Sequence, residues 1–150
     1  MRRFRMKKYR IIPIVISAVL ILALTACSGS SASKFENIKW VLESYGSRDD
    51  PEDVIEGTEI TATFNSGDNA VSGSAGCNSY SGGYEIKARL SIGALASTKM
   101  WCGEPEGRMI QETAYLNILQ AAEDYTVRNS RLTIDCGDKV LIFTESGADN

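Results

Sequence analysis

The sequence predicts an α+β fold, in which an antiparallel, curled or barrel-like β-sheet meander is covered by one α-helix. Three observations support this prediction. Short stretches that alternate apolar and polar residues, separated by turn residues, are typical of antiparallel strands. A single stretch instead repeats apolar residues at helical spacing, and three further strand-like stretches follow it. Strands, then one helix, then strands is the order of an α+β domain.

The strands expected before the helix are short and mostly alternating. They are Trp40–Tyr45, Thr58–Asn65, Ala70–Ser74, Tyr84–Lys87, Arg89–Ile92 and Ala96–Trp101. The alternation is clearest in the second, where Ile60, Ala62 and Phe64 should share the buried face. Gly82-Gly83 is expected to form a tight bend, and Asp49–Asp53 a solvated acidic loop.

One helix is expected after Pro105, with Glu104 and Glu106 near its start, where acidic side chains favour the helix dipole. Its apolar stripe comprises Ile110, Ala114, Tyr115, Ile118, Leu119 and Ala122. Gln111 and Glu112 lie off this stripe. The strands expected after the helix are Tyr125–Val127, Leu132–Asp135 and Lys139–Thr144.

The N-terminus has the organisation of a secretory signal peptide, predicted to cover residues 1–26. Six positive charges in the first ten residues precede an apolar run of 14 residues, Ile11–Leu24. A membrane-spanning helix needs about 18 residues or more, so this run is short for one. The alternative is a short N-terminal membrane anchor that stays attached.

The end of this run resembles a bacterial lipobox. Leu24-Thr25-Ala26-Cys27 places a small pair of residues before a cysteine, and the resemblance implies that the Cys27 thiol is acylated and becomes the mature N-terminus. Residues 27–33 would then form the lipidated cysteine and a Ser/Gly tether, residues 34–145 the globular domain, and residues 146–150 a polar tail. Such anchoring predicts a location on the extracytoplasmic face of the cell membrane or outer membrane.

Composition excludes several classes of function. The chain contains no histidine, so it has no Ser-His-Asp or Cys-His catalytic machinery and no His-ligated zinc. Without residues 1–26 it keeps 10 basic and 19 acidic residues, a net charge of −9. A charge of that sign repels phosphate backbones, and we expect no nucleic-acid partner. No catalytic residue, metal or cofactor is predicted.

Two motifs carry a family resemblance. Gly76-Cys77-Asn78-Ser79-Tyr80-Ser81-Gly82-Gly83-Tyr84 and Leu95-Ala96-Ser97-Thr98-Lys99-Met100-Trp101-Cys102 together resemble the paired signature of the META domain (HslJ-like) family, and the likeness extends over Trp40–Phe143. The resemblance implies a small barrel-like domain with one helix, common in lipoproteins of the bacterial envelope. It implies no settled activity.

The first motif admits two interpretations. It is either a structural corner, or one wall of a concave binding site. That site would be lined by Asn78, Tyr80, Thr98, Lys99 and Trp101. It would rest on the clustering of polar and aromatic residues near two bends.

The cysteines leave their pairing open. If Cys27 is lipidated, then Cys77, Cys102 and Cys136 remain, and any one disulfide leaves one thiol unpaired. We favour Cys77–Cys102, because it would join the two signature motifs; the alternative is three reduced, buried thiols.

Three classes of function remain. The first is a membrane-anchored lipoprotein with a non-catalytic binding or envelope-support role related to stress, whose partner is an unknown envelope protein or small ligand. The second is a carrier of an apolar ligand inside the barrel. The third, which we rank lowest, is a thiol redox protein that uses Cys77 and Cys102, because these residues lack the Cys-x-x-Cys spacing.

Overall fold

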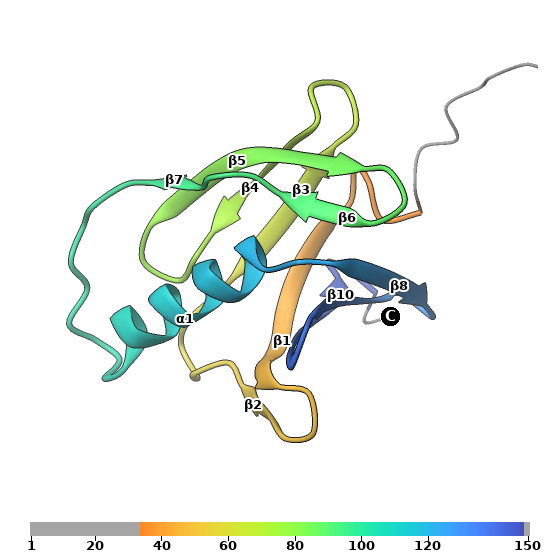
Figure 1. The fold of residues 1–150 in the computed structure, drawn as a ribbon. Helices are drawn as coiled ribbons and strands as arrows, with labels where there is room; N and C mark the ends of the chain where they lie inside the picture. The colour runs from red at the N-terminus through yellow and green to blue at the C-terminus, as the bar shows by residue number, and fades with distance from the viewer. Residues whose placement is uncertain (1–33, 149–150) are drawn as a thin grey trace, which may run out of the picture. The chain divides into compact units, whose positions relative to one another are not determined.

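The computed structural model describes residues 34–148 (Figure 1). These residues belong to one compact unit, Ala32–Asn150. The predicted signal peptide (1–26), the lipidation site Cys27 and the tether (27–33) lie outside the described residues, as do the last two residues of the polar tail. No helix within residues 34–148 has the length and apolar character needed to cross a membrane.

The described part of the chain contains ten strands and one helix. The strands are β1 (Lys39–Ser47), β2 (Pro51–Asp53), β3 (Thr61–Asn65), β4 (Ala70–Ser74), β5 (Ser79–Ile86), β6 (Leu90–Ile92), β7 (Ala96–Ser97), β8 (Asp124–Arg128), β9 (Arg131–Cys136) and β10 (Lys139–Glu145). The helix, α1 (Arg108–Gln120), connects β7 to β8.

The strands form one antiparallel sheet that curls into a nearly closed barrel. Their order is β6-β5-β4-β3-β1-β10-β9-β8, and the two end strands, β6 and β8, come close to each other. The helix packs against β1, β6, β9 and β10 (Figure 1). The predicted α+β class, with a curled sheet and one covering helix, is confirmed for the described residues.

Strand β1 is the centre of this sheet and the place where it bends. Its first part, Lys39–Val41, pairs with β3, whereas Ser44–Gly46 pairs with β2 on the same edge. Its other edge pairs with β10 through a register shift between Leu42 and Ser44. Such a bulge increases the local twist and bends the strand, which helps an open sheet to close.

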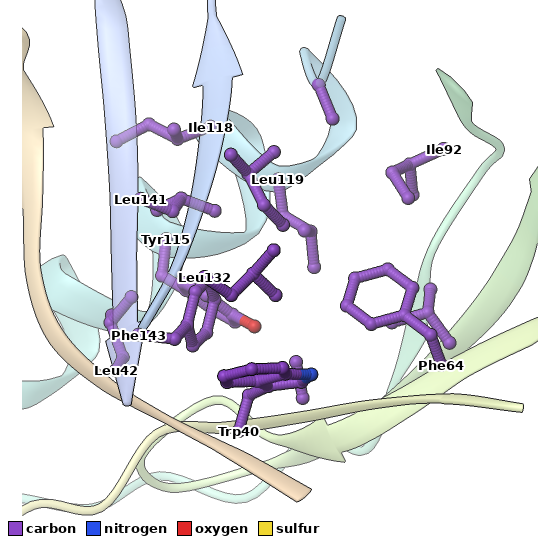
Figure 2. Close-up of a cluster of buried hydrophobic side chains, with 14 of the residues drawn as sticks. Trp40, Leu42, Phe64, Ile92, Tyr115, Ile118, Leu119, Leu132, Leu141 and Phe143 are labelled. Carbon is purple, nitrogen blue, oxygen red and sulfur yellow. The ribbon is translucent and has the colours of Figure 1, made fainter. Parts of the chain in front are cut away.

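Large side chains fill the barrel interior (Figure 2). The predicted alternation in β3 is confirmed, because Ile60, Ala62 and Phe64 are fully buried. Trp40 is also buried, and its indole N–H donates to the Phe35 carbonyl at 2.8 Å, which satisfies the polar atom inside the core. Helix α1 closes the core with apolar residues of its inner face. The interior is a packed core of the kind that makes a small barrel stable.

Two strand predictions need correction. Pro51–Asp53, expected to be part of a solvated loop, forms β2, because the second half of β1 has no β3 neighbour and leaves a free edge. The strand predicted at Ala96–Trp101 covers only Ala96–Ser97. Beyond Ser97, the Thr98 N–H still donates to the Ser79 carbonyl, but the Met100 N–H bonds to a side chain, as described below.

The prediction of a tight bend at Gly82-Gly83 is wrong, because both glycines lie inside the continuous strand β5. Their role is close packing. A Cβ atom added to Gly82 would lie 2.6 Å from Leu95 Cδ2 and 2.8 Å from the Ala94 carbonyl oxygen. The glycine therefore allows the segment after β6 to cross directly over β5.

The helix begins later than predicted. Most of the predicted stripe is buried, namely Tyr115, Ile118, Leu119 and Ala122, but not the first residue of that stripe. Gly107, with φ 84°, precedes the first helical residue, Arg108. Ile110, assigned to the buried stripe, is 77% exposed, whereas Gln111 and Glu112 are buried. The side chain of Gln111 accepts a hydrogen bond from the Ile55 N–H and donates one to Thr58. Polar residues replace apolar ones on this face because they satisfy the backbone and side-chain groups of neighbouring loops.

Candidate functional site

The first signature motif turns a corner immediately after β4. Gly76 has a φ of 110°, a conformation that glycine adopts at little cost. The corner is closed by a hydrogen bond from the Ala75 N–H to the Asn78 carbonyl, 2.7 Å long. The backbone N–H groups of Cys77 and Asn78 point to the Glu112 carboxylate, whose Oε2 accepts both at 3.1 and 2.8 Å. The corner is therefore fixed to the first half of the helix.

The side chain of Asn78 connects this corner to the second signature motif. Its amide Nδ2 donates to Glu112 Oε1 at 2.7 Å and to the Met100 carbonyl at 3.0 Å. Its Oδ1 accepts from the Met100 N–H at 2.7 Å and from the Thr98 hydroxyl at 2.8 Å. We call this set of contacts the Asn78 hub. Asn78 and Glu112 are buried, and the Asn78 amide uses both of its donor positions.

A disulfide adds a covalent link beside the hub. Cys77 and Cys102 are bonded, with Cα atoms 6.0 Å apart and 25 residues of separation, as favoured by the sequence. The hub holds the chain at Thr98 and Met100, and the disulfide holds it at Cys102. The segment between β7 and the helix is thus fixed at three alternate residues.

Tyr80 is a core residue of the barrel. Its ring is buried, and its hydroxyl donates to the Thr61 carbonyl at 3.0 Å and lies 2.7 Å from the Tyr115 hydroxyl. Burial raises the pKa of both phenols far above the usual value, so they stay protonated at neutral pH. Neither phenol is directed toward solvent.

The five residues of the predicted concave site separate into two groups. Asn78 and Tyr80 are buried and bonded to groups of the protein itself, whereas Thr98, Lys99 and Trp101 are exposed. Thr98 belongs to the hub through its hydroxyl, which also accepts from the Ser79 N–H at 3.2 Å. The structure therefore brings Asn78 and Thr98 together as a support, and presents Lys99 and Trp101 outward.

An apolar surface lies on this supported segment. Among the described residues, the exposed large hydrophobic side chains are Met100 (59% exposed), Trp101 (81%) and Ile110 (77%), and we call them the Trp101 patch. Trp101 and Ile110 share the wall of an open hollow of about 160 Å³ at the start of the helix. The indole also lies against Gly103, where an added Cβ would meet it at 2.9 Å. The sequence indicates Trp101 but not Ile110, because helical spacing predicts that Ile110 is buried.

A larger, open hollow of about 580 Å³ lies at the β5–β6 hairpin. Its lining mixes apolar and polar residues, namely Asn69, Gly83, Tyr84, Glu85, Ile86, Lys87, Ser91, Ile92 and Gly93. The Tyr84 hydroxyl donates to the Glu36 carboxylate, and burial together with this contact raises the pKa of the phenol. Gly83 and Tyr84, at the end of the first signature motif, line this hollow, but Asn78 and Trp101 do not.

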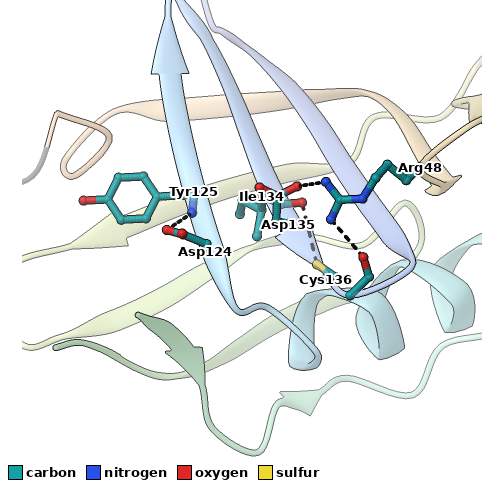
Figure 3. Close-up of polar contacts among 7 residues, drawn as sticks. Arg48, Asp124, Tyr125, Ile134, Asp135 and Cys136 are labelled. Atoms are coloured by element: carbon teal, nitrogen blue, oxygen red, sulfur yellow. Dashed lines mark hydrogen bonds and ion pairs between the residues drawn. The ribbon is translucent and has the colours of Figure 1, made fainter. Parts of the chain in front are cut away.

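The third cysteine of the described residues, Cys136, is a buried free thiol at the end of β9 (Figure 3). Its Sγ lies 3.7 Å from the Ile134 carbonyl, and burial and the neighbouring Asp135 raise its pKa to about 12. Arg48 covers this strand end by pairing with Asp135 at 2.6 Å and donating to the Gly137 carbonyl. A thiol with so high a pKa is a weak nucleophile. Within residues 34–148, no cluster of three or more candidate ligands could hold a metal ion.

Comparison with known proteins gives a family and a fold. The family model described as the META domain matches residues 33–148. A protein from Burkholderia xenovorans, with an NMR structure, is 31% identical over 75% of this chain and 84% of its own, with a TM-score of 0.63. A DUF4847 family protein from Bacteroides vulgatus, with a crystal structure, is 14% identical over 74% of this chain and 94% of its own, with a TM-score of 0.52. A search of curated proteins finds no match.

Proposed function

The chain belongs to the META domain family, and from that premise we propose that it is a lipid-anchored, non-catalytic binding protein of the bacterial envelope. In this proposal Cys27 anchors the chain to the extracytoplasmic face of the cell membrane or outer membrane. The folded domain then contacts an envelope protein through the Trp101 patch, in a role related to envelope support or stress. The descriptions of the family and of the similar structures name no enzymatic activity.

The observation that carries the proposal is the exposed Trp101 patch on a rigid support. Tryptophan is enriched among the residues that contribute most to protein interfaces, and methionine adapts to irregular partners. A loop that is already ordered loses little conformational entropy on binding. The hub and the disulfide supply that order, so the patch is presented in one conformation before a partner arrives.

The polar groups near the patch support a binding role over a catalytic one. Catalysis needs a positioned group that exchanges a proton near neutral pH. The Glu112 carboxylate is turned inward and accepts three N–H groups, and the Tyr80 phenol is held in the core. Both are therefore used to hold the structure.

The carrier hypothesis has a single observation in its favour, the β5–β6 hollow of about 580 Å³. The barrel interior, where the carrier hypothesis places the ligand, is filled by aromatic and aliphatic side chains (Figure 2). An apolar ligand would therefore have to lie at the hairpin surface. Saturable binding of an apolar fluorescent probe that Ile92→Lys abolishes would favour this second function.

Replacing Cys27 with serine is expected to release the protein from the membrane fraction. Serine cannot form the thioether, so neither acylation nor cleavage before residue 27 should follow. Fractionation of cells and intact-mass measurement of the full chain check this result. A Cys27→Ser chain that keeps the mass and membrane association of the wild type would contradict the lipoprotein assignment.

Replacing Trp101 with alanine is expected to reduce partner binding about thirtyfold, because a tryptophan that is an interface hot spot contributes about 2 kcal/mol. Since the side chain is 81% exposed, the melting temperature should stay near that of the wild type. Chemical cross-linking in intact cells measures the yield of adducts. Thr126→Ala, an exposed change on β8, is the matched control. Unchanged adducts in the Trp101→Ala chain would remove the patch from the proposal.

A further inference from the structure

The segment between β7 and α1, which carries Met100 and Trp101, has opposite charges at its two ends. Lys99 stands at its β7 end, and Glu104 and Glu106 stand at its helix end, all with exposed side chains. None of the three has an ion-pair partner in the part of the chain that the structure describes. Arg108 shares the helix end and donates to the Glu104 carbonyl at 2.8 Å. With Glu104, Glu106 and Arg108 together, the helix end carries one net negative charge, and the β7 end one positive charge.

The same surface contains both a protrusion and a hollow. Met100, 59% exposed, comes directly before Trp101 along the segment. The hollow of about 160 Å³ is lined by Trp101 and by the start of the helix, and Met100 is not part of its lining. A cavity near this volume accommodates a group as large as benzene. The hollow can therefore take one apolar side chain of the size of methionine.

Figure 1 shows this segment leaving β7 and descending to the start of α1, so the two ends of the charge pattern are separated in space. A two-fold rotation about an axis near Trp101 would place Lys99 of one copy opposite Glu104 and Glu106 of another. The same rotation would bring Met100 of each copy toward the hollow of its neighbour. A surface that meets itself in this way is the requirement for an isologous contact.

We propose that the Trp101 patch pairs with the same patch on a second copy of this chain. The inference rests on the proposed anchoring and binding role, and it names the partner. The three apolar side chains of the patch and its four charged neighbours are far fewer than the roughly 20–30 residues per side of a standard interface. Association of two free chains is therefore weak, and confinement to one membrane supplies the effective concentration that the pair needs.

The experiment uses the full-length anchored chain in the membrane of a bacterial host. The photoreactive residue p-benzoylphenylalanine replaces Ile110, which lies at the rim of the hollow and is exposed. Irradiation is expected to give an adduct that mass spectrometry identifies as two copies of the chain. The same probe at Thr126, on β8, is the control and should give none.

Charge variants test the predicted register. Lys99→Glu makes both ends of the segment negative and should lower the adduct about fivefold, because two symmetric exposed pairs change from attraction to repulsion. Lys99→Glu combined with Glu106→Lys reverses both ends. This doubly changed chain should again pair with itself, but poorly with the wild type, and differently tagged chains distinguish the two products.

The outcomes separate the two proposals. An adduct with a different protein, and none between copies, would overturn self-pairing and leave the binding role intact. No adduct from the Ile110 position, together with unchanged cross-linking in Trp101→Ala, would overturn both. A self-adduct that is insensitive to Lys99→Glu would also overturn the proposed contact.

Discussion

Glu112→Ala is expected to lower the free energy of unfolding by about 3–5 kcal/mol, because several buried donors lose their acceptor together. The carboxylate accepts the N–H groups of Cys77 and Asn78 and the Asn78 side-chain amide, at 3.1, 2.8 and 2.7 Å. Both Glu112 and Asn78 are nearly inaccessible to water, so solvent cannot easily replace these bonds. Urea denaturation followed by circular dichroism measures the change.

The glutamine variant makes this prediction sharper. In Glu112→Gln, the new Nε2 donor would face the Asn78 amide, which is also a donor at that position. Rotating Asn78 would not help, because its Oδ1 already accepts from Met100 and Thr98. Glutamine should therefore recover only part of the lost stability. Asn117→Ala, an exposed change on the same helix, should have little effect. A stable Glu112→Ala chain would mean that the hub is not needed to hold the corner.

Removal of the Cys77–Cys102 disulfide is expected to lower the free energy of unfolding by about 3 kcal/mol, since it closes a loop of moderate length in the unfolded chain. Cys77→Ala with Cys102→Ala gives the change without reductant, and urea denaturation measures it. The hub should keep residues 98–100 near the corner. The loss of protection from hydrogen exchange should therefore be largest in residues 101–107. Hydrogen exchange of the backbone amides resolves the two parts of the segment.

Cys136 supplies the control for the disulfide. Cys136→Ala removes a thiol that forms no disulfide in the described chain, so it should not alter the response to reductant. Thiol labelling of the oxidised chain in denaturant should modify Cys136 and neither Cys77 nor Cys102. If reductant lowered the free energy of unfolding equally in the wild type and in the chain that lacks Cys77 and Cys102, the result would contradict the disulfide. A reduction potential in the range of thiol oxidoreductases, rather than below about −300 mV, would favour the redox hypothesis.

Local patterns predicted the elements whose burial follows from alternation. Thr58–Asn65 is an example, since each residue that faces the core is apolar and each neighbour is not, so the sequence alone indicates the buried face. Strands β8 and β9 alternate in the same way, whereas β10 is marked by the continuous apolar run 140–143. The Cys77–Cys102 pair followed from joining two motifs, and the structure confirms it.

Contacts between residues distant in sequence determine the features that local patterns did not predict. Glu112 has the composition of a solvent-facing helix residue, and only the corner 34 and 35 residues earlier explains its burial. Gly82 has the local signal of a turn, whereas its partner Leu95 lies 13 positions away. Ile110 fits an apolar stripe, yet the helix turns its Gln111–Glu112 face inward to satisfy loop groups. In each case a neighbour distant in sequence overrides a local pattern.

The chain enters the described domain through Phe35, a residue with no exposed surface, four positions before the start of β1. Its ring lies 4.7 Å from that of Phe64 and 4.3 Å from that of Tyr125, and its carbonyl holds Trp40. If the chain is tethered at its N-terminus, mechanical tension from the membrane reaches this ring first. Tension must then pull an aromatic side chain out of the core before it reaches β1, a strand with hydrogen-bonded neighbours on both edges. Under the proposed anchoring, the end of the domain that bears the load is thus held by the aromatic core itself.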